Sequence, residues 1–351
     1  MATPKPARGM TSLVPKLGAS LLIASGFVYV LNRGGLPIWP GGAALSHVAV
    51  WAVPAYALVY CLAALLRTYR WIYLLRPIHA DLSARRVLGI GLVGFTAVLF
   101  APLRAGEVVR PWLLAQDGEI TFVQATGTVA AERIVDGLML TLILFAGMAS
   151  TTTLSPLPTH VGKLALPVAA VHHAAVFALV LFSSAFAAMF LFYFFRGPMT
   201  KLVRALLSPI SEKLAHFATD KLSQLVDGFR FLPSLQHGAA FFRDTLVYWA
   251  VCALSMLTLM RGAGLPASFG QACVTMGIMG LGSLIPSGPG FFGTYQLSAY
   301  CALAMFFPES AIVTQGAAFT FVSYATQLVI TALSCVVGFA LMSKSVPEVA
   351  S

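Results

Sequence analysis

The sequence has few charged residues: only 10% of its 351 residues are Asp, Glu, Lys or Arg, whereas 58% are hydrophobic. Soluble domains carry about 25% charged residues, so this composition excludes an ordinary soluble enzyme or binding domain. It indicates a polytopic membrane protein instead, because lipid accommodates so much apolar surface. No clear small-residue cleavage site follows the first apolar run, so we expect a retained first span.

Motifs of the common enzyme classes are also missing. The five cysteines lie in apolar stretches without a CxxC pair, which argues against a disulfide framework or a zinc site. The sequence has no HExxH, GxGD or GxSG motif and no P-loop that would couple ATP. His172 and His173 lack an acidic or cysteine partner at ligand spacing. We therefore expect no catalytic residue, metal or cofactor, and predict that the protein is not an enzyme.

A GxGxxG match at Gly89, Gly91 and Gly94 has a different explanation. It lies inside an apolar helical run with no strand before it, which a dinucleotide site would require. Small residues on one membrane helix let another helix approach closely. The motif therefore predicts helix packing.

Apolar runs define the predicted membrane spans, since a membrane helix needs about 20 mostly apolar residues. The candidate spans are 17–32, 44–66, 121–148, 165–195, 245–262 and 311–342. Two more apolar runs, 87–101 and 271–285, are short, and each ends at a stretch rich in Gly, Pro and polar residues.

These interruptions, 102–110 and 286–296, are the most informative feature of the sequence. Broken helices persist at bilayer depth only where the freed backbone is buried in protein or lines a wet cavity. We therefore predict two re-entrant helical hairpins, near 87–116 and 271–307, with a site between them.

The net charge of +10 favours membrane topology over nucleic-acid binding, because the basic residues lie beside apolar spans. With both termini cytoplasmic, 17 Lys and Arg residues fall inside and 3 outside, while Arg104 and Arg133 fall in the membrane. The inside segments are 1–16, 67–86, 110–120, 196–243 and 343–351. This count places the two hairpins on opposite faces, which is typical of an inverted repeat.

The predicted fold is thus an all-α integral membrane protein of about six full spans and two hairpins. Residues 17–342 form one polytopic domain between an N-terminal tail, 1–16, and a C-terminal tail, 343–351. The segments 67–86 and 211–231, the latter within the cytoplasmic segment 196–243, are basic or amphipathic and suit a lipid surface. An ordinary cytoplasmic loop helix is the alternative.

Six charged residues lie in the first predicted hairpin and the span after it. They are Arg104, Glu107, Arg110, Glu132, Arg133 and Asp136. Each buried charge costs roughly 2.5–3.5 kcal/mol on insertion scales, so the six groups need partners or water. The natural pairs join Arg104 or Arg110 to Glu132 or Asp136, and Glu107 to Arg133. Two interpretations stay open: the arginines hold a phosphate or carboxylate, or the pairs are a structural clasp.

The second interruption offers mainly backbone and neutral groups. Its glycines permit turns with positive φ, and its remaining N–H groups can converge on an anion. The predicted contacts are Pro286, Ser287, Gly288, Pro289, Gly290, Gly293 and Gln296. A simple kink between packed helices is the alternative.

Three motifs in this order carry a family resemblance. They are Pro102-x-Arg104-x-Gly106-Glu107-x-x-Arg110, then Glu132-Arg133-x-x-Asp136, then Pro286-x-x-Pro289-Gly290-x-x-Gly293. Together they resemble the flippase-like membrane domain family, which includes the membrane half of lysylphosphatidylglycerol synthases, along about residues 15–342. Family members commonly carry a glutamate where this chain has Gln296, so a proton- or cation-linked role there is in doubt. No aminoacyl-transfer domain follows, which implies the lipid-handling half alone.

The resemblance and the buried charges together predict a function. We expect a flippase in the bacterial cytoplasmic membrane that moves an anionic or polyprenyl- or glycan-linked lipid between leaflets. The expected partners are membrane lipids, with no nucleic acid. The alternatives are a non-transporting scaffold for a lipid-modifying or glycosyl-transfer enzyme, and an enzyme that uses the buried carboxylates directly.

Overall fold

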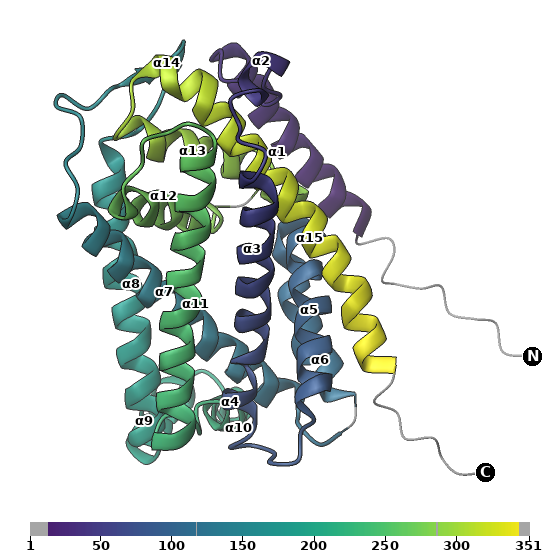
Figure 1. Cartoon of the computed structure of the whole chain (residues 1–351). Helices are drawn as coiled ribbons and strands as arrows, with labels where there is room; N and C mark the ends of the chain where they lie inside the picture. Colours follow the sequence, from purple (N-terminus) through teal and green to yellow (C-terminus); the bar gives the residue numbers. More distant parts are fainter. Residues whose placement is uncertain (1–12, 117, 286, 344–351) are drawn as a thin grey trace, which may run out of the picture.

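The computed structural model describes residues 13–116, 118–285 and 287–343, and these fold as a bundle of helices (Figure 1). The long helices are α1 (Leu13–Arg33), α3 (Ala52–Tyr69), α5 (Ala84–Phe100), α7 (Phe122–Ala149), α8 (Ala170–Phe194), α11 (Leu235–Gly262) and α15 (Ala317–Ser343). The shorter ones are α2 (Gly42–Leu45), α4 (Ile72–Leu75), α6 (Val109–Ala115), α9 (Arg196–Leu207), α10 (Glu212–Asp227), α12 (Phe269–Gly282), α13 (Thr294–Ala304) and α14 (Glu309–Ala311). A two-residue pair, β1 (His160–Val161) and β2 (Leu164–Ala165), is the strand content of the described residues. The all-α prediction is confirmed.

Four helical segments are long and apolar enough to cross a membrane. They are Ala52–Leu75, Ala170–Phe194, Leu235–Gly262 and Glu309–Ser343. Helix α7 has 28 residues but carries three charged side chains at its centre, and α1 has 21 residues. The count of six spans and the single-domain boundaries stay predictions. Of the two predicted tails, residues 1–12 and 344–351 lie outside the described part of the chain.

Polar caps set where several helices begin. Thr121 and Gln124 form a capping box at the start of α7, close to the predicted start of that span. Helix α11 begins well before the predicted residue 245, because the Ser234 hydroxyl accepts a hydrogen bond from the His237 amide at 3.2 Å. The helix therefore includes Arg243, which the charge count placed in the cytoplasmic segment 196–243.

Both sequence interruptions break a helix and turn the chain back on itself. The first joins α5 to α6 through a 3-10 turn, Pro102–Val108, and the second joins α12 to α13 through a turn that includes Pro289–Phe291. Helix α5 packs against α6, and α12 against α13, so each pair is a hairpin. The first hairpin starts at the end of the bundle near α4, the second at the end near α14 (Figure 1). Re-entry from opposite membrane faces and an inverted repeat stay predictions with which this arrangement agrees.

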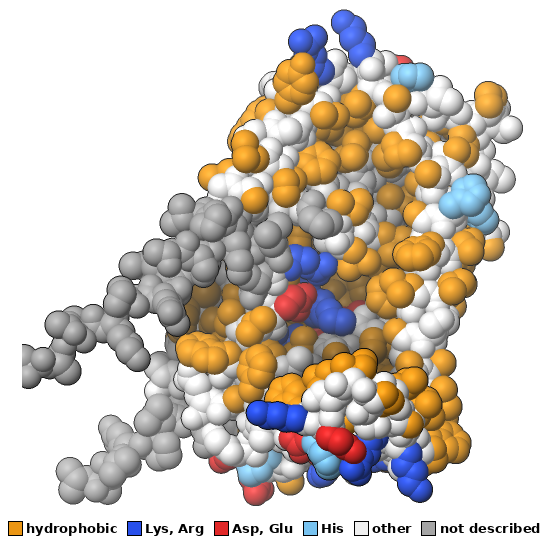
Figure 2. Space-filling view, turned by 180° about the vertical axis from the view of Figure 1, so that it is seen from behind, with side chains coloured by type: hydrophobic (Ala, Val, Ile, Leu, Met, Phe, Trp, Pro, Cys, Tyr) orange, Lys and Arg blue, Asp and Glu red, His pale blue; other side chains and the backbone are white. Residues whose placement is uncertain are grey.

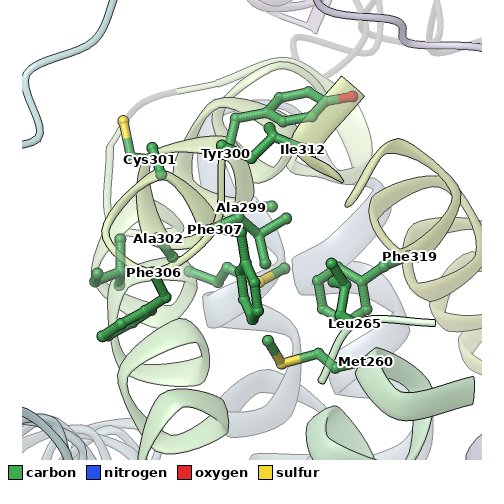
Figure 3. Packing of buried hydrophobic residues seen from close by; sticks show 14 of the residues in the cluster. Met260, Leu265, Ala299, Tyr300, Cys301, Ala302, Phe306, Phe307, Ile312 and Phe319 are labelled. Atoms are coloured by element: carbon green, nitrogen blue, oxygen red, sulfur yellow. The ribbon is translucent and has the colours of Figure 1, made fainter. Parts of the chain in front are cut away.

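Two hydrophobic cores lie on either side of the middle of the bundle. One joins α3, α11, α12, α13 and α15, and includes Met260, Tyr300, Phe306 and Phe319 (Figure 3). The other surrounds Trp71 and joins α4, α5, α6, α7 and α10. A third, smaller apolar cluster, Leu140, Ala253, Cys273 and Met276, joins α7, α11 and α12.

The predicted amphipathic segment forms α9 and α10. Val226 of α10 is buried in the second core, whereas Leu214 and Phe217 are exposed. One apolar face therefore packs on the bundle, and the exposed apolar residues are available to a lipid surface, whose contact stays a prediction.

The GxGxxG stretch packs against other helices, in agreement with the sequence interpretation. A Cβ atom at Gly89 would lie 2.9 Å from the carbonyl oxygen of Gly338 in α15. At Gly94 a Cβ atom would overlap the Cγ atom of Arg110. Gly94 thus lets the buried Arg110 side chain pass directly over α5.

Replacing Gly94 by Val is expected to destabilise the fold by about 1–3 kcal/mol, since it overpacks the stem of Arg110. Gly26 in α1 has open space around its Cα atom, so Gly26→Val is the matched control. Unfolding of both variants in detergent micelles, followed by circular dichroism, measures the difference. Equal stability of the two variants would contradict the close packing at Gly94.

Candidate functional site

A cavity of about 710 Å³ occupies the middle of the bundle. Its walls come from α3, α5, α6, α7, α8, α11, α12, α13, α15 and the turns of both hairpins. Five charged residues line it: Arg67, Arg104, Glu107, Arg133 and Asp136. Figure 2 shows charged side chains within a hollow midway along one face, framed by hydrophobic side chains. The cavity therefore combines a charged part with an apolar surround.

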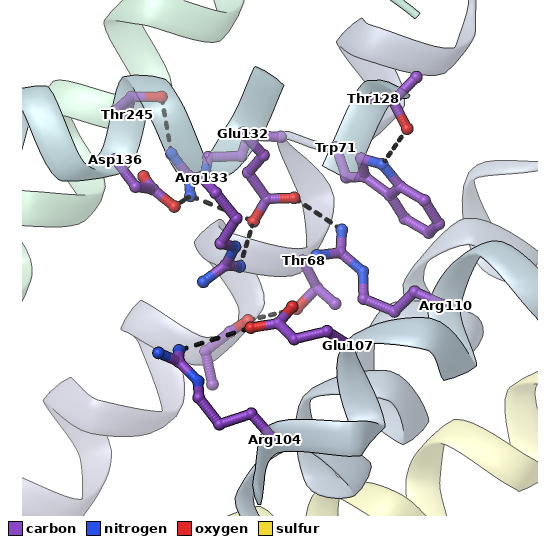
Figure 4. Close-up of polar contacts among 12 residues, drawn as sticks. Thr68, Trp71, Arg104, Glu107, Arg110, Thr128, Glu132, Arg133, Asp136 and Thr245 are labelled. Atoms are coloured by element: carbon purple, nitrogen blue, oxygen red, sulfur yellow. Dashed lines mark hydrogen bonds and ion pairs between the residues drawn. The ribbon is translucent and has the colours of Figure 1, made fainter. Parts of the chain in front are cut away.

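Glu132 is the centre of the charged cluster (Figure 4). Its carboxylate accepts hydrogen bonds from Arg110 at 2.7 Å, Arg133 at 3.0 Å and Arg70 at 3.4 Å. The side chains of Glu132, Arg110 and Arg70 are all fully buried. Buried charges are tolerated only when they are paired and hydrogen-bonded. The Glu132 carboxylate accepts hydrogen bonds from three guanidinium groups and so partly compensates the charge of each. The predicted pairing of Arg110 with Glu132 is confirmed.

Asp136 is paired with a residue that the sequence interpretation placed elsewhere. Arg70 donates to Asp136 at 2.7 Å and to the Thr245 hydroxyl at 2.8 Å, and Trp249 donates to Asp136 at 3.3 Å. The prediction that 67–86 is an interfacial segment is wrong at its start, since Arg70 is 0% exposed. Arg70 connects the end of α3 to α7 and α11, so it fastens three helices together.

Arg67 is the second residue that the sequence interpretation missed. It lines the cavity one helical turn before Arg70, and its guanidinium carbon lies 3.6 Å from the centre of the Phe95 ring. The sequence did contain a signal for this pair. Arg67 and Arg70 are three positions apart at the end of an apolar run, and residues at this spacing lie on the same face of a helix. Charge counting assigned both arginines to the cytoplasm, and the structure brings them to the interior.

The turns of the two hairpins meet through Arg104. Its guanidinium group donates to the Ser283 carbonyl oxygen at 3.3 Å and lies 5.5 Å from the centre of the Phe291 ring. Arg104 and Phe291 are the described non-glycine residues with positive φ, at 59° and 57°. Each turn therefore holds a strained residue, and the two side chains are in contact.

The pairing predicted for Glu107 was wrong. Glu107 lies 3.4 Å from Arg104, whereas Arg133 pairs with Glu132. The left-handed backbone at Arg104 keeps it off the helix that α6 forms, so Arg104 does not share a helical face with Arg110. Arg104 and Glu107 both line the cavity, and each of their side chains is about a quarter exposed.

The second hairpin contributes different residues from those predicted. Within the described residues of 286–296, only Phe291 and Tyr295 line the cavity. The predicted contacts that do not line it are Ser287, Gly288, Pro289, Gly290, Gly293 and Gln296, and Pro286 lies outside the described residues.

Packing explains why those residues turn away from the cavity. The Ser20 hydroxyl of α1 donates to the Ser287 carbonyl oxygen at 3.3 Å, and Gly288 lies directly against Ala24. The Gln296 side chain accepts a hydrogen bond from the Gly293 amide at 2.7 Å and so caps its own helix. Their role in binding a substrate stays a prediction. The observed contacts resemble the alternative interpretation, a kink between packed helices.

Charges in the cluster do not balance. Arg67, Arg70, Arg104, Arg110 and Arg133 face the three carboxylates Glu107, Glu132 and Asp136, which leaves two positive charges. No group of three or more His, Cys, Asp or Glu residues within the described part of the chain is arranged to hold a metal ion. The cluster is therefore suited to an anion.

A bundle of apolar helices around a charged interior defines a polytopic membrane protein with a polar site between its helices. Residues 19–331 match the family model of the lysylphosphatidylglycerol synthase TM region. The chain therefore belongs to this family, as its motifs predicted. No curated protein and no solved structure matches it.

Proposed function

We propose that this protein moves an anionic phospholipid or a polyprenyl- or glycan-linked lipid between the leaflets of a bacterial cytoplasmic membrane. Membership of a lipid-associated membrane family supports a lipid substrate. The observation that carries the proposal is the cavity of about 710 Å³, which combines five charged residues with apolar walls. An amphiphilic lipid needs both kinds of surface, one for its headgroup and one for its chains.

The cluster divides into a fixed part and an adjustable part. Glu132, Arg110 and Arg70 are fully buried and hold one another, so they position the cavity wall. Arg104, Glu107 and Arg133 are each about a quarter exposed, at 26%, 27% and 28%. A headgroup phosphate that enters the cavity can replace Glu107 as the partner of Arg104, because guanidinium groups bind phosphate in bidentate geometry.

Movement of one hairpin relative to the other would open the cavity to each leaflet in turn. The contacts of Arg104 with Ser283 and Phe291 join the two hairpin turns directly. Breaking these contacts would separate the turns. This alternating-access scheme is a fold-level analogy with transporters that have inverted repeats. In this scheme both chain termini stay in the cytoplasm and the protein has no catalytic step.

Reconstitution into liposomes with fluorescently labelled phospholipids tests the proposal. Wild type is expected to carry inner-leaflet lipid to the outer leaflet, where a membrane-impermeant quencher removes its signal. Arg104→Gln is expected to slow this movement about 10- to 100-fold, the effect of losing a charged hydrogen bond worth about 1.5–3 kcal/mol.

Arg204→Gln is the matched control, because Arg204 lies on α9 with its side chain 52% exposed and is expected to leave the rate unchanged. If wild type moves none of the labelled lipids, the transport proposal fails and a non-transporting scaffold becomes the better interpretation. If Arg104→Gln folds and moves lipid as fast as wild type, the assignment of the site fails instead.

A further inference from the structure

Two arginines of the cluster have no carboxylate of their own. The shortest ion pairs join Arg110 to Glu132 and Arg70 to Asp136, both at 2.7 Å, while Arg104 has Glu107. Arg133 shares Glu132 with Arg110. For Arg67, no ion pair with any described residue is present, and its Nε atom is buried without a hydrogen-bond partner.

These two arginines face the cavity over one aromatic ring. The guanidinium carbons of Arg67 and Arg133 lie 3.6 Å and 5.5 Å from the centre of the Phe95 ring, and all three residues line the cavity. Buried Nε atoms without a hydrogen-bond partner occur in all five arginines of the cluster, so the accessible part of Arg133 is the rest of its side chain, which is 28% exposed. Stacking on an aromatic ring stabilises a guanidinium group but leaves its in-plane N–H donors free. Donors from both side chains are therefore available to one ligand.

We propose that Arg67 and Arg133 form a subsite for a dianionic headgroup, a terminal phosphate monoester or a diphosphate, on the lipid that this cavity holds. The inference rests on the proposed function only in taking the ligand to be a lipid. A terminal phosphate monoester carries about −1.5 to −2 charges at pH 7 and matches the two uncompensated arginines. A phosphodiester lipid such as phosphatidylglycerol supplies one negative charge, and an aminoacylated or zwitterionic headgroup would bring a cation to a positive site.

Equilibrium binding to the full-length protein in detergent micelles tests this assignment. The probes are fluorescent phosphatidate, which has a terminal phosphate, and phosphatidylglycerol and phosphatidylcholine with the same chains. Wild type is expected to prefer phosphatidate over phosphatidylglycerol by at least about tenfold, since a second charge-assisted contact is added. Arg67→Gln is expected to weaken phosphatidate binding by at least about tenfold more than phosphatidylglycerol binding, and so to abolish this preference.

Two further variants control for folding and geometry. Arg76→Gln removes an exposed arginine nine residues along the same segment and is expected to keep the wild-type preference. Arg67→Lys keeps the positive charge but lacks the planar guanidinium group, so this variant is expected to keep part of the preference for phosphatidate. Arg67→Gln with wild-type unfolding temperature and undiminished preference for phosphatidate would overturn the assignment.

Inorganic pyrophosphate distinguishes a lipid from a soluble phosphate. If it displaces phosphatidate at equal concentration, the ligand is a soluble phosphate compound and the lipid assignment is overturned. The transport assay separates this inference from the proposed function. Preference for phosphatidate without movement supports the subsite and contradicts transport, whereas movement without preference for two charges contradicts the subsite alone.

Discussion

Replacement of Glu132 by Gln is expected to destabilise the protein by about 3–5 kcal/mol, the usual cost of removing one partner from a buried ion pair. The substitution preserves the shape of the side chain but removes the charge that three arginines share. Arg110 would then be a fully buried cation with no carboxylate of a described residue within ion-pair distance. Unfolding in mixed micelles, followed by circular dichroism, measures the loss.

Glu107→Gln is the matched control for this prediction. The Glu107 side chain is 27% exposed to the cavity and lies 3.4 Å from Arg104, so loss of its charge is expected to cost no more than about 1 kcal/mol. If Glu132→Gln is no less stable than Glu107→Gln, Glu132 is not the structural centre of the cluster.

A double substitution of Arg70 and Asp136 is expected to be more stable than either single substitution. Arg70→Met alone leaves Asp136 buried with only the Trp249 hydrogen bond, and Asp136→Leu alone leaves Arg70 with the 3.4 Å contact to Glu132 and the Thr245 bond. Each single change is expected to cost about 3–5 kcal/mol. Two apolar side chains of similar volume would pack together, so the double variant is expected to recover much of the loss.

Measured unfolding free energies of the wild type, both single variants and the double variant give the coupling between Arg70 and Asp136. Contacting residues typically show about 0.5–3 kcal/mol of coupling, so additive effects would contradict a direct pair. The double variant keeps the net charge of the cluster unchanged. The double variant is therefore also expected to retain lipid movement. That result would indicate that Arg70 and Asp136 stabilise the fold and do not bind the lipid.

The two interpretations of the buried charges fit different residues of the cluster. Arg70, Arg110 and Glu132 are fully buried and hold α3, α6 and α7 together, as a structural clasp would. Arg67 and Arg133 line the cavity, as the proposed binding site requires. The fully buried residues and the proposed binding residues are adjacent because Glu132 is hydrogen-bonded to both Arg110 and Arg133.

Several features were readable from the sequence for direct physical reasons. Gly and Pro interrupted two apolar runs, and both interruptions are helix breaks in the structure. Arg110 and Glu132 were predicted partners because an unpaired charge among apolar residues is too costly. Family membership was predicted from three short motifs in order, and the family match confirms it.

Other features depended on contacts between distant segments. Arg70 and Thr245 are 175 positions apart, and no sequence pattern predicts the hydrogen bond between them. The pairing of Glu107 depended on the positive φ of Arg104, a backbone state that arginine rarely adopts. The Gln296 side chain accepts a hydrogen bond from the Gly293 amide and caps its own helix, so its oxygen is not free for a ligand. The residue type alone does not indicate this contact.

By itself, the sequence determined that this is an all-α membrane protein of a lipid-associated family with charges inside its apolar core, because composition and helix breaks act locally along the chain. Only the tertiary structure decided which charges neutralise one another, and that Arg67 and Arg133 share the Phe95 ring with the buried Arg110. Charge pairing depends on distance in space, and a helical bundle places residues of seven or more separate segments around one cavity.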